Sequence, residues 1–198
     1  MKNEQESSAV WSDDLVQILA RIWACLRAGP APQTLIEGMA LGRLATLGTI
    51  GADGGPELRQ VMLRAVNESR GLIDIHTDSA TAKCAELAAN PKASVLLWRA
   101  DLNLQMRFKG RAEIVTGQEA APLWQAVPAQ ARPNYGVMPA PGSAISAPGN
   151  FSRVADPARF AVLRISIEAI DAVILAEPQH RRASFERRDR WRGQWLAP

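Results

Sequence analysis

The sequence predicts a mainly β protein of the α+β class, built as an antiparallel β-barrel with flanking helices. Between residues 42 and 176, apolar stretches with strand-like alternation are separated by short turns rich in glycine, asparagine and aspartate. The few helical segments do not alternate regularly with the strands, as βαβ units would require. Many short strands interrupted by a few helices are typical of an antiparallel barrel.

Length and composition predict one soluble domain over residues 1–198. We divide it into an N-terminal helix at 12–28, a barrel core at about 42–176 and a C-terminal tail at 177–198. The hydrophobic share of 47% and the charged share of 22% are ordinary for a globular protein. A net charge of +3 gives only a weak attraction to polyanions.

The residue counts and the hydrophobic pattern of the sequence exclude several classes of protein. Two cysteines, Cys25 and Cys84, are too few for a disulfide framework, and neither lies in a metal-ligand spacing. The chain has only two histidines to add to these cysteines, His76 and His180, so we expect no metal site. The opening MKNEQESS lacks the basic start and apolar run of a signal peptide, and no stretch is long enough to cross a bilayer. We therefore expect a cytoplasmic protein with no membrane partner.

Residues 12–28 carry the first helix signal. Ser12 is a plausible N-cap, Asp13 and Asp14 suit the positive helix start, and Gly29-Pro30 would end the helix. Apolar side chains recur at helical spacing, which predicts a helix lying on a larger body; they are Leu15, Ile18, Leu19, Ile22 and Leu26.

From residue 43 the pattern changes to strands. RLATLGTI (43–50) and ELRQVMLRAV (57–66) flank an ADGGP turn, which predicts a hairpin. LIDIHTD (72–78) reads as the third strand. The alanine-rich segment 79–90 opens with a capping residue, Ser79, and ends before a proline, which favours a short helix.

The second half continues the same alternation. Strands are predicted at 92–100 and 102–115, followed by a helix at 117–127. Residues 128–150 hold five prolines and three glycines and predict a long loop, which in a compact domain is usually functional or disordered. Two further strands are predicted, at FAVLRISIEA (160–169) and IDAVILAE (170–177).

Two arginines bracket the apolar stretch RQVMLR at residues 59–64. A guanidinium near a protein interior needs an anion. The anion is either an internal acid, such as Glu57 or Asp74 for Arg59, or a bound phosphate. Arg59 and Arg64 are five residues apart and point to opposite faces of a regular strand, so they share a ligand only if the strand bulges or twists strongly.

The start of the predicted helix 79–90 is suited to a phosphate. A helix N-terminus offers unpaired N–H groups and a partial positive charge. Thr77, Ser79 and Thr81 add hydroxyl donors, and Lys83 and Arg59 supply charge. The alternative is that Arg59 pairs with an acid and Lys83 is solvated.

Five motifs in order carry a resemblance to a known family. They are RQVMLR, IDIHTDSATAK, ELAANPKASVLLW and LQMRFKG within residues 43–116, and more weakly WLAP at the C-terminus. This order resembles the pyridoxamine 5′-phosphate oxidase-like family of FMN-binding proteins. The resemblance implies a Greek-key split β-barrel that forms a homodimer, with FMN bound between the two subunits.

The resemblance also implies roles for individual residues. Arg59 and Lys83 would hold the FMN phosphate, Arg64 and Gln105 would address the flavin ring, and Arg181 would contact a small-molecule substrate. The full implied cofactor set is Arg59, Val61, Met62, Arg64, His76, Thr77, Thr81, Lys83, Gln105 and Ser143. We therefore predict an FMN-dependent oxidoreductase with an unidentified small substrate. The alternatives are a non-catalytic flavin-binding or stress-related protein, or a binder of heme or deazaflavin.

Departures from the family pattern bear on the substrate. Ala82 stands where the family has a second phosphate-binding arginine, and Val173 where it has a tryptophan. Ala183 and Phe185 replace a histidine and an arginine of the segment that helps to hold the vitamin substrate in the oxidases. We therefore expect weak or absent oxidation of pyridoxamine 5′-phosphate.

Three further features have an ordinary and a functional interpretation. His76 is either an acid or base near the flavin or a ring filling an aromatic position, and we favour the second. Cys84 is either a reactive thiol beside Lys83 or a buried residue, and again we favour the second. The arginine-rich tail contains Glu186 and Asp189, which favours solvated or intersubunit ion pairs over nucleic-acid binding.

Overall fold

The protein is described by a computed structural model that places residues 11–28, 35–36, 39–40 and 44–198. The predicted helix stop at Gly29-Pro30 and the first residue of the predicted strand 43–50 lie outside these residues. No helix in the placed segments is both long and apolar enough to span a membrane. The same segments hold no group of three or more side chains arranged to bind a metal ion.

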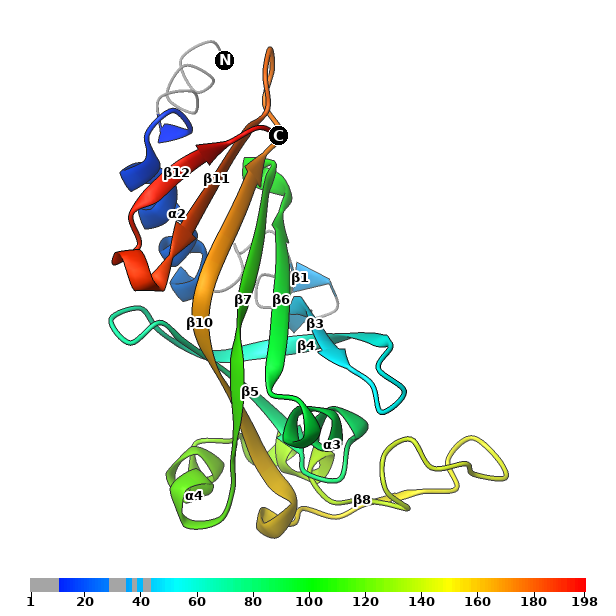
Figure 1. Ribbon diagram of the computed structural model, residues 1–198. Coiled ribbons are helices and arrows are strands. Elements are labelled where there is room, and N and C mark those ends of the chain that lie inside the picture. The colour runs from blue at the N-terminus through cyan, green and yellow to red at the C-terminus, as the bar shows by residue number, and fades with distance from the viewer. Residues whose placement is uncertain (1–10, 29–34, 37–38, 41–43) are drawn as a thin grey trace.

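The core is a six-stranded antiparallel β-barrel, as the sequence predicted (Figure 1). Its strands follow the order β10-β5-β4-β3-β6-β7, and β7 pairs back with β10 to close the barrel. Alternate residues along each strand point inward and form one apolar core. The strands are β3 (Leu44–Ile50), β4 (Pro56–Asn67), β5 (Leu72–Asp78), β6 (Lys92–Arg99), β7 (Leu104–Val115) and β10 (Phe160–Ile174).

β10 corrects one prediction. The two strands predicted at 160–169 and 170–177 form a single strand of 15 residues. Its pairing with β7 shifts between Ile167 and Ala169, so the chain bulges there without breaking. Opposite the bulge lies Gly110, where a Cβ atom would meet the Ser166 carbonyl oxygen at 2.1 Å. Glycine is therefore required for the two strands to approach so closely.

The C-terminal tail extends the sheet, which the sequence analysis did not predict. β11 (Arg181–Glu186) pairs with β10, and β12 (Gly193–Leu196) pairs with β11. Helix α2 (Leu15–Ala28) lies along these strands (Figure 1). Its predicted apolar face is confirmed, because Ile18 and Ile22 are fully buried.

The first turn of α2 corrects the predicted cap. Asp14 caps the helix in place of Ser12. Asp14 Oδ1 accepts hydrogen bonds from the N–H groups of Val16 at 2.8 Å and of Gln17 at 3.0 Å.

Two short helices lie at the opposite end of the barrel from β12 (Figure 1). They are α3 (Ala82–Ala89) and α4 (Gly117–Gln125). The predicted helix at 79–90 therefore exists but starts later, with Thr81 at its N-cap position in place of Ser79. The remaining short elements are β1 (Leu35–Ile36), β2 (Met39–Ala40), and the 3₁₀ turns Ala100–Leu102, Ala129–Asn134, Pro157–Arg159 and Arg187–Asp189.

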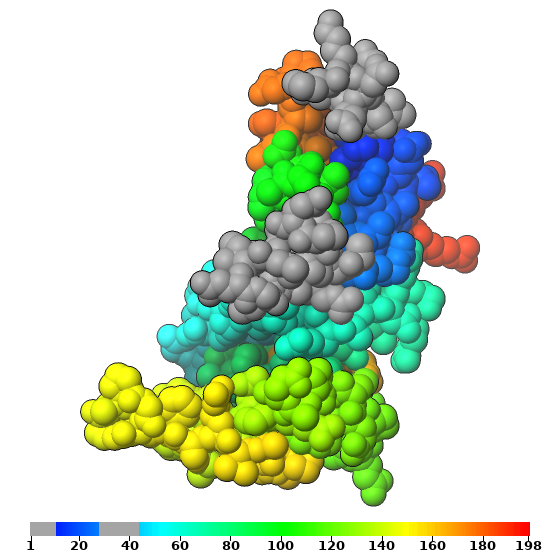
Figure 2. All heavy atoms as spheres, turned by 180° about the vertical axis from the view of Figure 1, so that it is seen from behind, coloured from blue at the N-terminus to red at the C-terminus, as the bar shows by residue number. Residues whose placement is uncertain are grey.

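The predicted long loop forms a projecting arm. β8 (Val137–Met138) pairs with β9 (Ser152–Arg153) at the base of the arm. Residues 139–151 extend beyond this pair, away from the barrel, as the front and rear views both show (Figures 1 and 2). The arm therefore departs from the barrel at the same end as α3 and α4.

Candidate functional site

The start of α3 gathers three of the predicted site residues. Lys83 Nζ donates a hydrogen bond to Thr77 Oγ1 at 2.9 Å, and Thr77 Oγ1 lies 3.3 Å from Thr81 Oγ1. Thr77 is buried at the end of β5, and Lys83 is half-buried. Burial, together with the nearby charge of Arg59, lowers the pKa of Lys83 from its ordinary value. An ammonium group, two hydroxyl groups and a helix start therefore converge here.

The backbone at the start of α3 is open to an acceptor. Thr81 occupies the N-cap position, but its side chain makes no capping hydrogen bond and donates instead to the Asp78 carbonyl oxygen at 2.8 Å. The first N–H groups of the helix keep their partial positive charge, which suits a phosphate. Cys84 is buried beneath them, as predicted, and burial raises the pKa of its thiol.

Arg59 has an internal acid partner. Its Nη2 donates to Glu86 Oε2 at 2.8 Å, and its Nη1 donates to Thr49 Oγ1. Glu86 lies on α3 and is not one of the two acids that the sequence suggested. Glu57, which the sequence did suggest, forms a longer ion pair, with Oε2 3.9 Å from Arg59 Nη2, whereas Asp74 is paired with Arg164. About a fifth of the Arg59 side chain is exposed, so the paired guanidinium still reaches the surface beside α3.

Arg64 lies at a bulge of β4. The pairing of β4 with β5 passes from Leu63–Ile75 directly to Ala65–Asp74, which leaves Arg64 as the extra residue. The irregularity that Arg59 and Arg64 would need to approach one ligand therefore exists. Arg64 hydrogen-bonds the side chain of Tyr135, although the burial of Tyr135 outweighs this effect and raises its pKa.

His76 points outward from β5 beside Arg64. Burial first, and the charge of Arg64 second, lower the pKa of His76 to about 4. The ring is therefore neutral at neutral pH. It packs edge-on against Phe160 with the ring centroids 5.0 Å apart. This geometry favours the interpretation of His76 as a ring that fills an aromatic position.

Asp78 fastens the arm to the loop before α3. This buried carboxylate pairs with Arg159 at 2.8 Å and accepts hydrogen bonds from the N–H groups of Ala80 at 2.9 Å and Gly136 at 2.8 Å. Burial acts to raise the pKa of Asp78, but these hydrogen bonds and the charge of Arg159 outweigh it and lower the pKa. Sequence reasoning missed Asp78, because its partners come from distant segments.

Two of the residues predicted to contact the cofactor lie on β4 between the two arginines. Val61 is buried in the barrel, opposite Ala45 of β3, and Met62 is half-buried, opposite Leu44.

Three predicted residues are not gathered at α3. Gln105 pairs with Trp98, near the far end of β6 from the α3 side. Trp98 lies six residue steps along β6 from Lys92, a span of about 20 Å. Ser143 is exposed on the arm, and Arg181 donates to Asp13 Oδ1 at 2.7 Å. The structure therefore divides the predicted site into a phosphate-type cluster at α3 and separate residues elsewhere.

A family model matches most of the chain. Residues 33–174 match the family model described as pyridoxamine 5′-phosphate oxidase. The chain is 38% identical over 87 residues to pyridoxine/pyridoxamine 5′-phosphate oxidase of Thermosynechococcus vestitus, and 40% identical over 86 residues to that of Nitrobacter winogradskyi. These stretches cover 44% and 43% of this chain, but only 40% and 39% of the two relatives.

Solved structures share the fold over most of the chain. One is a pyridoxamine 5′-phosphate oxidase-related, FMN-binding protein of Nostoc punctiforme, with a TM-score of 0.72, 21% identity, and coverage of 90% of this chain and 96% of that one. Another is PhzG of Burkholderia lata in complex with tetrahydrophenazine-1-carboxylic acid, with a TM-score of 0.69, 19% identity and coverage of 92% of both chains.

Proposed function

The chain belongs to the pyridoxamine 5′-phosphate oxidase-like family of FMN-binding split barrels, and from this membership we propose that it binds FMN noncovalently and acts as an oxidoreductase on a small substrate. The observation that carries the proposal is the cluster of Lys83, Thr77 and Thr81 at the uncapped start of α3. It combines hydroxyl and N–H donors with a cation, which is the donor set a phosphate monoester requires.

Arg59 completes the phosphate end in this proposal. Glu86 holds the guanidinium in place, and the charge of Arg59 acts beside Lys83. Ala82 stands in the first turn of α3 where the family has a second phosphate-binding arginine. In this proposal the positive charge that holds the phosphate therefore comes from Arg59 and Lys83. The ring end is assigned to the backbone of Val61 and Met62 and to Arg64 at the β4 bulge.

We propose that a second copy of the chain supplies Gln105. Within one chain, Gln105 lies at the far end of β6 from α3. Three large apolar side chains are exposed on the outer barrel face between the two places: Leu58 is 70% exposed, Leu96 38% and Trp98 48%. A mostly apolar hollow of about 450 Å³ opens on the same face between β3, β4, β6 and β7. A homodimer that buries this face would bring Gln105 of one copy to the α3 cluster of the other.

Bound flavin supplies the two-electron redox chemistry, and the protein provides position and electrostatic environment. Arg64 places a positive charge on the ring side, and the neutral His76 provides a surface for packing. A proton-transferring side chain is not required for this role.

The test is the spectrum and mass of the purified full chain. We expect the absorption bands of oxidised flavin, and FMN in place of FAD after acid release. Light scattering should give a dimer, which Leu58→Glu should dissociate, whereas Val16→Glu on the exposed face of α2 should not. A colourless protein that does not bind added FMN contradicts the proposal. A yellow protein that oxidises no substrate supports flavin storage or sensing instead.

A further inference from the structure

One aspartate on the outer barrel face is shared by two arginines. Asp171 of β10 accepts from Arg107 Nη2 of β7 at 3.0 Å, and from Arg182 of β11 through Nε at 3.3 Å and Nη2 at 2.9 Å. The three side chains come from adjacent strands of one sheet, so the sheet register fixes their relative positions. We refer to them as the Arg107–Asp171–Arg182 cluster.

The cluster has more positive charge and more donors than its aspartate satisfies. Two guanidinium groups face one carboxylate, which leaves a net charge of +1. Burial acts to raise the pKa of Asp171, but the Arg182 hydrogen bond and both arginine charges outweigh it, so the carboxylate stays ionised. Arg107 Nε is buried without a hydrogen-bond partner. The side chains of Arg107 and Arg182 are 40% and 32% exposed, so a ligand can reach them.

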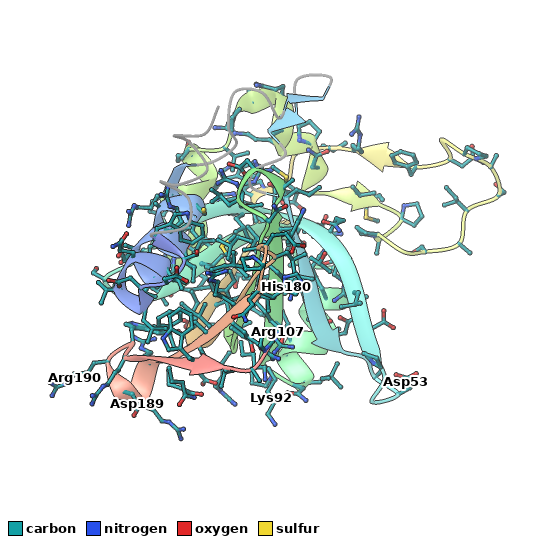
Figure 3. The ribbon with its side chains drawn as sticks, turned by 90° about the horizontal axis from the view of Figure 1, so that it is seen from above. Asp53, Lys92, Arg107, His180, Asp189 and Arg190 are labelled. Carbon is teal, nitrogen blue, oxygen red and sulfur yellow. The ribbon has the colours of Figure 1, made fainter. Side chains whose placement is uncertain are left out.

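The cluster lies next to Gln105. Arg107 follows Gln105 by two residues on β7, so both point to the same face with Cα atoms about 7 Å apart. Val173 pairs with Gln105 on one side and with Arg182 on the other, and its small apolar side chain lies between them. Seen from above, Arg107 and Lys92 lie on one side of the molecule, between the β3–β4 turn at Asp53 and the turn at Asp189 and Arg190 (Figure 3).

We propose that the Arg107–Asp171–Arg182 cluster binds the carboxylate group of a small organic acid, and that this acid is the substrate presented to the flavin. The second part rests on the proposed function, which places Gln105 at the flavin ring. A carboxylate held between the two arginines would lie above Val173. Its separation from Gln105 would be about the width of one aromatic ring.

Charge and shape favour a carboxylate over a phosphate. A monoanion neutralises the net charge of +1, whereas a phosphate dianion would reverse it. Guanidinium groups present pairs of parallel donors, which match the two oxygens of a planar carboxylate. Gly110 and the β10 bulge set the spacing of β7 and β10 next to the cluster, so the arrangement is built into the barrel.

Calorimetric titration with benzoate tests the site, using benzamide as the uncharged isostere and inorganic phosphate as the competing anion. We expect Arg107→Gln and Arg182→Gln each to weaken benzoate binding about tenfold or more, the scale of one charge-assisted hydrogen bond. Arg111→Gln is the matched control: it removes the same charge from the same face of β7 but does not contact Asp171. Arg182→Lys keeps the charge and should recover only part of the affinity.

FMN affinity and the melting temperature are measured in parallel for every variant. A chain that binds no FMN but binds benzoate through these arginines overturns the proposed function and leaves the carboxylate site standing. Equal binding of benzamide, tighter binding of phosphate, an equal loss in Arg111→Gln, or no benzoate binding at millimolar concentration would overturn the carboxylate site. Unaltered benzoate affinity in Arg107→Gln and Arg182→Gln does so as well.

Discussion

Arg59 of β4 and Glu86 of α3 form a hydrogen-bonded ion pair, with 2.8 Å between Nη2 and Oε2. Glu86 also accepts a hydrogen bond from the buried Thr49 hydroxyl at 2.5 Å, and Arg59 donates to the same hydroxyl. Strand and helix are therefore joined beside the group of donors at the start of α3. The pair orients the guanidinium, and it also places a negative charge close to any bound phosphate.

Arg59→Ala should weaken FMN binding by about 1.5 to 3 kcal/mol, the scale of a charge-assisted hydrogen bond. The unpaired Glu86 carboxylate adds to this loss, because it then repels the phosphate without compensation. The double variant Arg59→Ala/Glu86→Gln should recover part of the affinity, and Glu86→Gln alone should bind FMN at least as tightly as the parent. Quenching of FMN fluorescence on titration measures each constant. Unchanged affinity in Arg59→Ala would remove Arg59 from the site.

Lys83 should make FMN binding sensitive to alkaline pH. Burial lowers the pKa of Lys83, so the ammonium group proposed to hold the phosphate is lost at a lower pH than for an ordinary lysine. The affinity for FMN should therefore fall at a lower pH than the ordinary lysine pKa would give, and Lys83→Arg should move the fall to higher pH. Titrations at a series of alkaline pH values measure this. Identical profiles for both proteins would show that Lys83 does not carry the charge.

His76 should destabilise the fold in acid. Its pKa falls from 6.5 to about 4 in the folded protein, so below about pH 6.5 the unfolded chain takes up a proton that the folded chain does not. Stability should decrease as the pH falls through this window, by on the order of 1 kcal/mol after allowance for solvent screening. Urea unfolding at about pH 7 and about pH 4.5 should show a smaller decrease in His76→Phe than in the parent.

Gly136→Ala should be strongly destabilising. Gly136 has φ of +129°, and a Cβ atom would lie 1.9 Å from the Val154 carbonyl oxygen. Gly117→Ala is the comparison: its φ is +60° and nothing lies within 4 Å of the added atom, so it should cost only about 1 kcal/mol. Equilibrium unfolding in urea measures both. An equal loss of unfolding free energy in the two variants would mean that the backbone at the base of the arm shifts easily to accommodate the added Cβ atom.

Oxidation of pyridoxamine 5′-phosphate should be weak or absent. By the resemblance to the family, Ala183 and Phe185 replace two residues that help to hold the vitamin substrate in the oxidases, and both are buried in the apolar core with 1% exposure. Arg181 is tied to Asp13. Turnover is measured by the appearance of pyridoxal 5′-phosphate. Efficient turnover would show that other residues replace the missing contacts.

Local patterns in the sequence predicted most of the barrel. The alternation of apolar and polar residues predicted both ends of β3, β5 and β6 to within one residue, because one face of every strand is buried. It failed at β10, where two apolar runs read as two strands because a bulge displaces one residue without ending the strand. The tail strands β11 and β12 were missed, since their arginines conceal the alternation of Ala183 and Phe185.

The candidate site was predicted where it is local in the sequence. Thr77, Thr81 and Lys83 lie in one short segment that runs from the end of β5 into α3, and the helix start brings them together. The ion pairs were not predicted, because they join distant residues: Arg59 and Glu86 are 27 residues apart, and Asp78 and Arg159 are 81 apart. Such partners are chosen by the register of the sheet, and no short motif specifies that register.

Asp78 joins the root of the arm to the loop that opens α3, whereas residues 139–151 extend past that junction. The tip can therefore change in length and composition without disturbing the barrel, while the buried Asp78 carboxylate helps to fix the root. Grafting a different tip between β8 and β9 offers a direct way to replace the projecting segment and leave the junction at Asp78 intact.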